Sequence, residues 1–409
     1  MIKFANPSRV LSKPNELSRK FLILLPFLVW IDCTAFHAYV IWSNNCFGPL
    51  QGFIESDLNL TKVQFALISG SAQSLIYCIG QIFNWRIVNH FGLKTVFFIA
   101  VQSMLVSNLI MSMTHSFEMA LVARLLSGVG SLFAFICLSL AVRENFSEDM
   151  QGTMIGASGF ISALLGSAGF WVNSYFFGWR EVFGFLAKVG LIILMVLALF
   201  PASTKSNSNS KPRKGRRFKI PSILTKDVFL MIYCAGVGFA VMQYFSNNEL
   251  YNFLSIRELE HIPLMMSFLW VGNAFGCILS GFLIDRYGCY LDILRYYAMF
   301  AFVGILGILF LKAKWYFFLP FFFCLGIPAS GYVVVVSYFN KYLSSTNGSS
   351  AVSLMDFFGG LACLIIPALM GMIFQYTVYL GPLNVQVYQH IFLVLVPIIT
   401  LPLFIKLKP

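Results

Sequence analysis

Residues 262–288 read IPLMMSFLWVGNAFGCILSGFLIDRYG, and this stretch decides the fold class. From 262 to 284 it contains no Lys, Arg, Asp or Glu, and about 20 apolar residues in a helix are enough to cross a bilayer. Charge returns at Asp285 and Arg286, and Gly288 follows as a residue that favours the end of a helix. The stretch therefore predicts a transmembrane helix that ends in a short charged turn.

The rest of the chain has the same character, since 58% of its 409 residues are hydrophobic and 11% are charged. Soluble domains carry about 25% charged residues, so lipid must be the solvent for most of this chain. The sequence thus predicts an all-α polytopic membrane protein, with no room for a sizeable catalytic domain and no enzymatic activity. We expect twelve transmembrane helices at 21–43, 63–85, 95–113, 117–141, 152–176, 181–201, 227–250, 262–284, 293–311, 315–338, 349–372 and 390–405.

The formal net charge of +12 is explained by membrane topology. With both termini in the cytoplasm, 21 of the 28 Lys and Arg residues fall in cytoplasmic segments or, for Arg295, at the cytoplasmic end of the ninth span, and five fall in external loops. This asymmetry follows the positive-inside rule. We therefore expect a multi-pass protein of the inner or plasma membrane with both termini cytoplasmic, and no nucleic-acid partner.

A polar, basic segment divides the spans six and six, and its Ser/Asn/Lys composition is typical of a flexible linker. The turns NHFGLK (89–94) and DRYGCY (285–290) lie at corresponding positions of the two halves, which indicates an internal repeat. The predicted organisation is a cytoplasmic tail (1–20), a six-helix bundle (21–201), the linker (202–226) and a second six-helix bundle (227–409).

Two local patterns predict details of individual helices. Thr61 and Gln64 have the spacing of a capping box at the start of the second span. The tenth span contains GIPASG (326–331), where Gly and Pro should kink or break the helix. Broken backbone survives in a membrane only where it is buried or lines a cavity, so this segment is either a cavity wall or a static bend.

Three motifs resemble those of the major facilitator superfamily. GFLIDRYG (281–288) is similar to its cytoplasmic signature through Gly281, Asp285, Arg286 and Gly288. RLLSGVG in the fourth span resembles its Arg-x-x-x-Gly-x-Gly motif through Arg124, Gly128 and Gly130, and GWREVF (178–183) resembles its entry into the sixth helix. The resemblance covers the whole chain and implies two pseudo-symmetric six-helix bundles that expose a central site alternately to either side.

The departures from the family pattern leave the direction of transport open. Asn89 stands where the first-half signature usually has Asp, and the fifth span lacks the Gly-Pro of drug antiporters. In contrast, WIDCTAF (30–36) resembles an Asp-x-Thr motif of some multidrug exporters. Import of a metabolite and export of a drug or siderophore-like compound both remain possible.

The resemblance also implies a conformational gate at the signature, which locks the cytoplasmic side when the protein faces outward. In this gate, Asp285 is expected to meet the N-terminal end of the fifth helix near Gly152 or to pair with Arg143. Arg286, Gly281 and Gly288 would shape the turn.

Ionisable side chains within spans are costly and are therefore functional candidates. Asp32 and Arg124 have similar predicted heights in helices that line the central cavity of the resembling family, so we predict that they pair when no substrate is bound. Protonation of Asp32 or an anionic substrate would then release Arg124 for a bidentate contact. A static structural pair is the alternative.

Asp356 lies within the eleventh span, and the predicted spans of the second half contain one basic residue, Arg295, at the cytoplasmic end of the ninth span. Burial disfavours the charged form of an unpaired carboxyl group, so Asp356 could carry a proton or help to bind a cation. Further side chains could form hydrogen bonds with a substrate or with neighbouring helices: His37, Tyr39, Gln243, Tyr244 and Asn247.

These observations predict a proton-coupled secondary transporter of a small organic solute, preferably acidic or zwitterionic. The alternatives are a multidrug or siderophore-type exporter and, from another class, a receptor on a transporter scaffold that does not transport. We expect a monomer in the lipid bilayer with a small-molecule substrate and protons as partners, and neither a cofactor nor a metal, because the nine cysteines form no Cys-x-x-Cys pair.

Overall fold

The computed structural model describes residues 16–174, 178–199, 225–342 and 345–404, and every regular element in these ranges is a helix. The first half of the chain contains α1 (Glu16–Asn45), α2 (Phe47–Asp57), α3 (Lys62–Ala66), η1 (Leu67–Ser71), α4 (Ala72–Phe91), α5 (Leu93–Ser112), α6 (Phe117–Asn145), α7 (Glu148–Gly166), η2 (Ser167–Ser174) and α8 (Trp179–Leu199). The second half contains α9 (Lys226–Asn247), α10 (Leu250–Ile256), α11 (Ile262–Tyr287), α12 (Tyr290–Phe310), η4 (Trp315–Phe318), α13 (Leu319–Gly326), η5 (Ile327–Ser330), α14 (Gly331–Tyr342), α15 (Ser345–Leu380), α16 (Val385–Leu393) and α17 (Leu395–Phe404).

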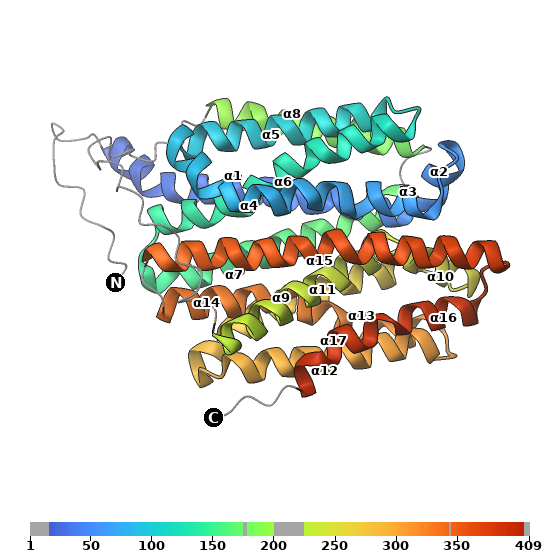
Figure 1. Cartoon of the computed structure of the whole chain (residues 1–409). Coiled ribbons are helices and arrows are strands. Elements are labelled where there is room, and N and C mark those ends of the chain that lie inside the picture. Colours follow the sequence, from blue (N-terminus) through green and yellow to red (C-terminus); the bar gives the residue numbers. More distant parts are fainter. Residues whose placement is uncertain (1–15, 175–177, 200–224, 343–344, 405–409) are drawn as a thin grey trace.

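Helices occupy the described part of each of the twelve predicted spans. Within the described ranges, nine helices are long and apolar enough to cross a membrane. Most of the predicted linker, 202–226, lies outside the described residues. Two short helices, α2 and α10, were not predicted. Each follows the first long helix of its half, and both lie at the same end of the molecule, the right-hand end of Figure 1.

The local patterns in the sequence explain where individual helices begin, bend and end. Thr61 Oγ1 accepts a hydrogen bond from the Gln64 backbone N–H at 3.2 Å, and Gln64 Oε1 accepts one from the Thr61 N–H at 2.9 Å, so the capping box is confirmed. The predicted break in the tenth span is the 3₁₀ turn η5. Gly288 ends α11 with φ +65°, a left-handed conformation that favours glycine.

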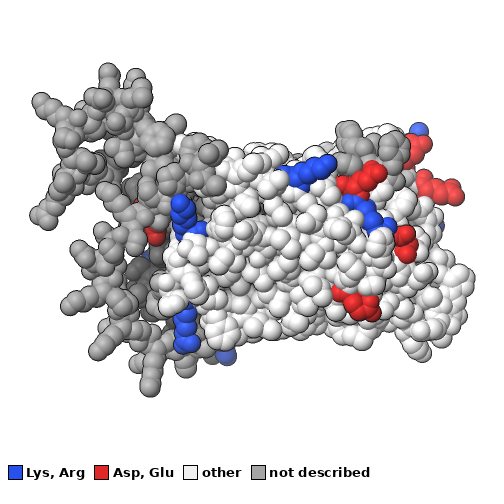
Figure 2. Space-filling model, turned by 90° about the horizontal axis from the view of Figure 1, so that it is seen from above, with Lys and Arg blue, Asp and Glu red and all other residues white. Residues whose placement is uncertain are grey.

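The halves meet along two pairs of long helices, since α4 packs against α15 and α7 packs against α11 (Figure 1). On the face shown in Figure 2, the broad middle of the molecule is uncoloured, and most of the charged side chains lie towards the two ends. Large apolar side chains such as Ile82, Met113 and Phe282 are exposed on the outside of the bundles. This surface suits lipid contact.

The glycines of the fourth-span motif serve helix packing. A Cβ atom on Gly128 would lie 2.6 Å from the Gln73 backbone oxygen in α4, and one on Gly130 would lie 3.0 Å from the Ala100 oxygen in α5. α6 can therefore approach both neighbours closely only because these positions lack side chains.

Candidate functional site

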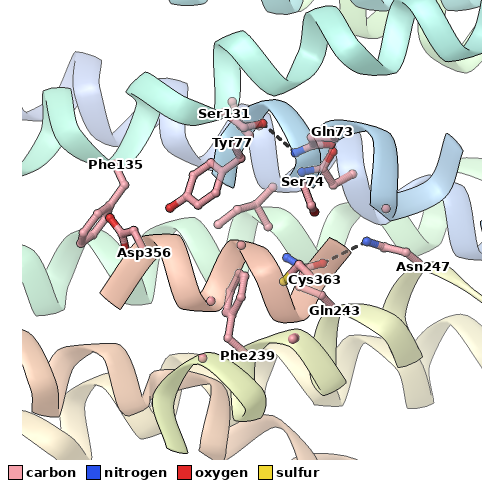
Figure 3. A pocket seen from close by; sticks show the side chains of 18 of the residues that line it. Gln73, Ser74, Tyr77, Ser131, Phe135, Phe239, Gln243, Asn247, Asp356 and Cys363 are labelled. Atoms are coloured by element: carbon pink, nitrogen blue, oxygen red, sulfur yellow. Dashed lines mark hydrogen bonds between the residues drawn. The ribbon is translucent and has the colours of Figure 1, made fainter. Parts of the chain in front are cut away.

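A central cavity lies between the two halves, with about 1330 Å³ of empty space when the open space at its mouth is included. α1, α4 and α6 line it from the first half, mainly α9 and α15 from the second, and Figure 3 shows several of the side chains that reach it. Among the described lining residues there is no Lys or Arg, and Asp356 is the one Asp or Glu. The wall therefore combines amides, hydroxyls and aromatic rings with a single carboxyl group. Its principal polar and aromatic members are His37, Asn44, Gln73, Tyr77, Ser131, Phe135, Phe239, Gln243, Tyr244, Asn247, Asn248, Tyr332 and Asp356.

Asp356 is 9% exposed, and its Oδ2 atom has no hydrogen-bond partner. It projects from α15 into the cavity near the ring of Tyr77 in the first half (Figure 3). A buried polar atom without a partner is rare, because desolvation is costly unless something replaces water. Asp356 is thus a residue of the cavity wall with one carboxyl oxygen that no contact in this conformation compensates.

A second group of polar atoms without partners lies where α9 ends. The Tyr244 hydroxyl, Asn247 Oδ1 and Asn248 Nδ2 have no hydrogen-bond partner, and all three residues line the cavity. Asn247 Nδ2 donates to Gln243 Oε1 at 2.9 Å, which fixes the orientation of the Asn247 amide. At the end of α9, residues of the cavity wall thus carry both donors and acceptors that have no partner.

Arg124 lies behind the cavity wall and is 2% exposed. Both of its terminal nitrogens donate to Asn44 Oδ1 at 3.2 Å, its Nε donates to the Ile68 backbone oxygen at 2.6 Å, and one terminal nitrogen also donates to Gln73 Oε1. The guanidinium carbon lies 4.4 Å from the centre of the Phe47 ring. These contacts stabilise the buried positive charge through neutral oxygens and a cation–π contact.

The predicted pair of Asp32 with Arg124 is wrong for this conformation. Arg124 directs its donors to Asn44, Ile68 and Gln73, and no ion pair of Asp32 occurs among the described residues. Asp32 is only partly buried and does not line the cavity. Similar predicted height along two helices was therefore not enough to bring the side chains together, because height leaves the rotation of each helix about its axis undetermined. A coupling role for Asp32 stays a prediction.

Of the five residues expected to bond either a substrate or a neighbouring helix, four line the cavity: His37, Gln243, Tyr244 and Asn247. The exception is Tyr39, whose hydroxyl donates to the Leu186 backbone oxygen at 2.9 Å and accepts from Asn108 at 2.7 Å inside the first half. It ties α1 to α5 and α8, so Tyr39 follows the alternative of a contact between neighbouring helices. Contact of the other four with a substrate stays a prediction.

Sequence reasoning missed several lining residues of the first half, above all Gln73 and Phe135. Gln73 belongs to SGSAQS (69–74), a polar run inside an apolar span that could have indicated a cavity wall. Its Nε2 donates to Ser131 Oγ at 2.7 Å (Figure 3). Phe135 packs edge-on against Tyr332, with ring centres 5.7 Å apart, and no pattern in the sequence distinguishes it from the many other phenylalanines.

The broken tenth span contributes to the wall beyond its break. Tyr332, in the first turn of α14, lines the cavity, whereas the residues of η5 do not. η5 instead packs against α9, where a Cβ atom on Gly238 would lie 2.8 Å from the Pro328 oxygen. The break is therefore a buried packing feature that sets the direction of Tyr332.

The halves are joined at the end formed by α2 and α10, which we call the α2/α10 end. There, Lys62 Nζ in α3 lies 3.0 Å from Glu249 Oε1, and Gln51 Nε2 in α2 donates to the same oxygen at 2.6 Å. Ser69 donates to Asn248 Oδ1 at 2.7 Å, beside the cavity. A Cβ atom on Gly48 would lie 2.1 Å from the Ser246 backbone oxygen, so backbones of the two halves are in direct contact. The cavity is therefore closed at this end.

The predicted gate lies at the opposite end and is described only in part. A Cβ atom on Gly281 would have no other atom within 4 Å. Arg286 is exposed, and its guanidinium carbon lies 5.9 Å from the centre of the Phe282 ring. The side chains of Asp285 and Arg143 lie outside the described residues, so their predicted contact stays a prediction.

The chain is similar in sequence to two curated proteins. One is an uncharacterized protein of Campylobacter jejuni, Cj0987c, which is 26% identical over 194 residues, 46% of this chain and 60% of the relative. The other is the vitamin B6 transporter bsu1 of Schizosaccharomyces pombe, 25% identical over 215 residues, 50% of this chain and 40% of the relative. The matches thus span about half the length of these relatives.

Two solved structures share the fold. The nucleoside transporter NupG aligns with a TM-score of 0.72 at 10% identity, over 93% of this chain and 98% of that chain. A bacterial homolog of the human lysosomal transporter Spinster, solved in an inward-facing and unoccupied conformation, aligns with a TM-score of 0.61 at 15% identity, over 96% of this chain and 93% of that chain. The family model of the Major Facilitator Superfamily matches residues 33–367, and this chain belongs to that superfamily.

Proposed function

We propose that this chain is a secondary transporter of a small polar solute that is neutral or cationic, and that Asp356 binds either the coupling proton or a basic nitrogen of the solute. The observation that carries the proposal is the free Oδ2 atom of Asp356 in a cavity whose described lining has no Lys or Arg. A carboxyl group in such a place has no cation to neutralise it, so a proton or a positively charged ligand group stabilises it.

The surroundings of Arg124 weaken the case for an acidic substrate. Its guanidinium is already bonded to Asn44, Ile68 and Gln73, and it does not line the cavity. An anionic group would have to displace these bonds before it could reach Arg124. The sequence favoured an acidic substrate because Arg124 was expected to bind it, and these contacts argue against that role.

The amides and rings of the wall suit a planar solute with several hydrogen-bonding groups. Tyr244, Asn247 and Asn248 offer a donor and acceptors without partners, and Phe135, Phe239 and Tyr77 offer aromatic faces. Aromatic faces stabilise both flat rings and cations. The names of two similar proteins, a vitamin B6 transporter and a nucleoside transporter, lead us to include pyridoxine and nucleosides among the test ligands.

The same cavity would be exposed alternately to the two sides by rocking of the halves. We infer from the Lys and Arg distribution that the α2/α10 end faces away from the cytoplasm. The contacts at that end then support an inward-facing state for this conformation.

The test is a thermal-shift screen of the purified protein in detergent, followed by uptake into proteoliposomes. The panel holds pyridoxine, nucleosides, amino acids, organic acids, sugars and hydrophobic cations at pH 5.5 and 7.5, with Asp356→Asn beside the wild type. The proposal is supported if a neutral or cationic compound stabilises the wild type and is taken up by it. The same compound should neither stabilise Asp356→Asn nor be taken up by that variant. Stabilisation by carboxylates alone would overturn the substrate class. Binding without uptake under any gradient would favour a receptor, and export of hydrophobic cations would favour a multidrug exporter.

A further inference from the structure

Three ionisable side chains meet at the α2/α10 end, and we call Glu55, Lys62 and Glu249 the latch cluster. Lys62 Nζ lies 2.8 Å from Glu55 Oε2 and 3.0 Å from Glu249 Oε1. Gln51 Nε2 donates to both carboxylates, to Glu55 Oε1 at 2.8 Å and to Glu249 Oε1 at 2.6 Å. Glu55 and Lys62 belong to the first half and Glu249 to the second, so one ammonium group serves two carboxyl groups across the boundary between the halves.

Glu249 accepts hydrogen bonds or ion-pair contacts at both of its carboxylate oxygens. Besides Gln51 and Lys62 on Oε1, its Oε2 accepts hydrogen bonds from the Tyr388 hydroxyl at 2.9 Å and from Asn252 Nδ2 at 3.1 Å. Both oxygens are thus occupied by donors. The side chain is 5% exposed, so these donors replace its water.

Glu55 has fewer hydrogen-bond donors of its own than Glu249. Its partners are Lys62 and Gln51, both of which it shares with Glu249. Two nearby arginines have partners elsewhere: Arg180 in α8 lies 2.6 Å from Asp57 at the end of α2, and Arg257 at the end of α10 donates to the Ile308 and Leu311 backbone oxygens. Burial, and then the negative charge of Glu249, raise the pKa of Glu55, and these effects outweigh the opposing effect of Lys62. Two carboxyl groups that share one cation do not both ionise easily, and the raised pKa of Glu55 makes this residue the candidate for the proton.

We propose that Glu55 is a proton-binding site that controls the α2/α10 end: with the proton bound the halves close there, and with the proton lost Glu55 and Glu249 repel each other and the halves separate. The inference rests on the alternating-access part of the proposed function and is independent of the substrate class. Tyr388, Lys62, Glu249 and the Asp57–Arg180 pair are the titratable groups that surround this site on α2, α3, α8, α16 and the junction of α9 and α10.

The chain connects this proton site directly to the cavity. Glu249 follows Asn247 and Asn248, which line the cavity, and Asn248 Oδ1 accepts the hydrogen bond of Ser69 across the halves. Separation of Glu55 from Glu249 therefore breaks the same boundary that covers Asn247 and Asn248. Loss of one proton at the latch cluster would open the cavity towards this end.

The direction of the pH effect follows from the raised pKa of Glu55 in the closed state. In an open state Glu55 is hydrated and has the ordinary pKa of about 4.3. The closed state is favoured most below that value. The ratio of closed to open protein falls as the pH rises to the raised pKa. For one proton this ratio falls by at most about tenfold per pH unit.

The experiment measures the distance between two spin labels on the full chain in lipid nanodiscs without ligand, from pH 4.5 to 8. The labels are attached through Met113→Cys and Lys312→Cys, which are exposed in the two halves at this end, with the exposed Cys289 replaced by Ser. A control without the two introduced cysteines measures background labelling. We expect the short-distance population of the wild type to decrease as the pH rises.

Two variants distinguish the proposal from a general effect of pH. Glu55→Gln, which is neutral and keeps a hydrogen-bonding side chain, should stay closed throughout the range, and Glu249→Gln should likewise lose most of the pH dependence. Glu258→Gln, an exposed carboxyl group beyond α10, should behave as the wild type. A constant wild-type distance, or a Glu55→Gln variant that still opens with rising pH, would overturn the proposal. Because no ligand is present, failure to find a transported substrate leaves this result unaffected.

Discussion

Both terminal nitrogens of Arg124 donate to the side-chain oxygen of Asn44, at 3.2 Å each, and this contact joins α6 to α1 behind the cavity. The buried guanidinium is therefore satisfied without any carboxylate. Its five donors form a planar fork that Lys cannot reproduce. Arg124 thus acts first as a structural link within the first half.

We predict that Arg124→Ala lowers the free energy of unfolding by about 3 kcal/mol, because Asn44, Gln73 and the Ile68 oxygen lose a charged donor in a buried place. Arg124→Lys should recover only part of this loss. Thermal unfolding in detergent measures the effect, with Lys188→Ala, an exposed residue of α8, as the control. An unchanged unfolding temperature together with lost binding of an anionic ligand would instead support the direct substrate contact expected from the sequence.

Asp356→Asn should reduce substrate uptake by at least about tenfold, because the amide has nearly the same shape but can neither bind a proton nor neutralise a cation. Its unfolding temperature should be equal to or above that of the wild type, since the unpaired carboxyl group is replaced by a neutral one. Uptake and thermal unfolding are measured on the same preparation, with Glu260→Gln as an exposed control. Normal uptake by Asp356→Asn would remove this residue from the proposed function.

Gly48 allows a close approach between the halves, and Gly52 on the same helix provides a matched control. A Cβ atom on Gly48 would lie 2.1 Å from the Ser246 oxygen, whereas nothing lies within 4 Å of a Cβ atom on Gly52. Gly48→Ala should therefore prevent full closure at the α2/α10 end and reduce uptake at least tenfold. Gly52→Ala should leave uptake unchanged and stabilise α2 slightly, by about 0.5–1 kcal/mol. Equal effects of the two substitutions would show that this contact does not matter for closure.

The thermal stability of the closed protein should depend on pH through Glu55. Since the pKa of Glu55 is raised in the folded state, its contribution to stability is greatest at pH values below its ordinary pKa of about 4.3 and is lost as the pH rises to the raised value. Lys62→Gln should make this dependence steeper, because two carboxyl groups then face each other without a cation. Unfolding temperatures from pH 4.5 to 8 provide the test. A Lys62→Gln variant that is most stable at high pH would contradict it.

The sequence by itself determined the elements that depend on neighbouring residues. Apolar runs predicted the helices. The capping box of Thr61 and Gln64 begins α3, the GIPASG segment contains the 3₁₀ turn η5, and α11 ends at Gly288. These features follow from hydrogen bonds and backbone conformations within a few residues, and from the length of apolar chain that lipid requires. For the same reason, Gln243, Tyr244 and Asn247 could be predicted to lie on the cavity wall from the polar end of one span.

Only the tertiary structure decided which distant side chains meet. Arg124 bonds to Asn44 and not to Asp32, and Lys62 joins Glu55 to Glu249, which lies almost 200 residues further along the chain. Such contacts depend on the rotation of each helix about its axis and on how the two halves dock. A shift of one residue turns a side chain by about 100°, so height along a helix alone could not predict these partners.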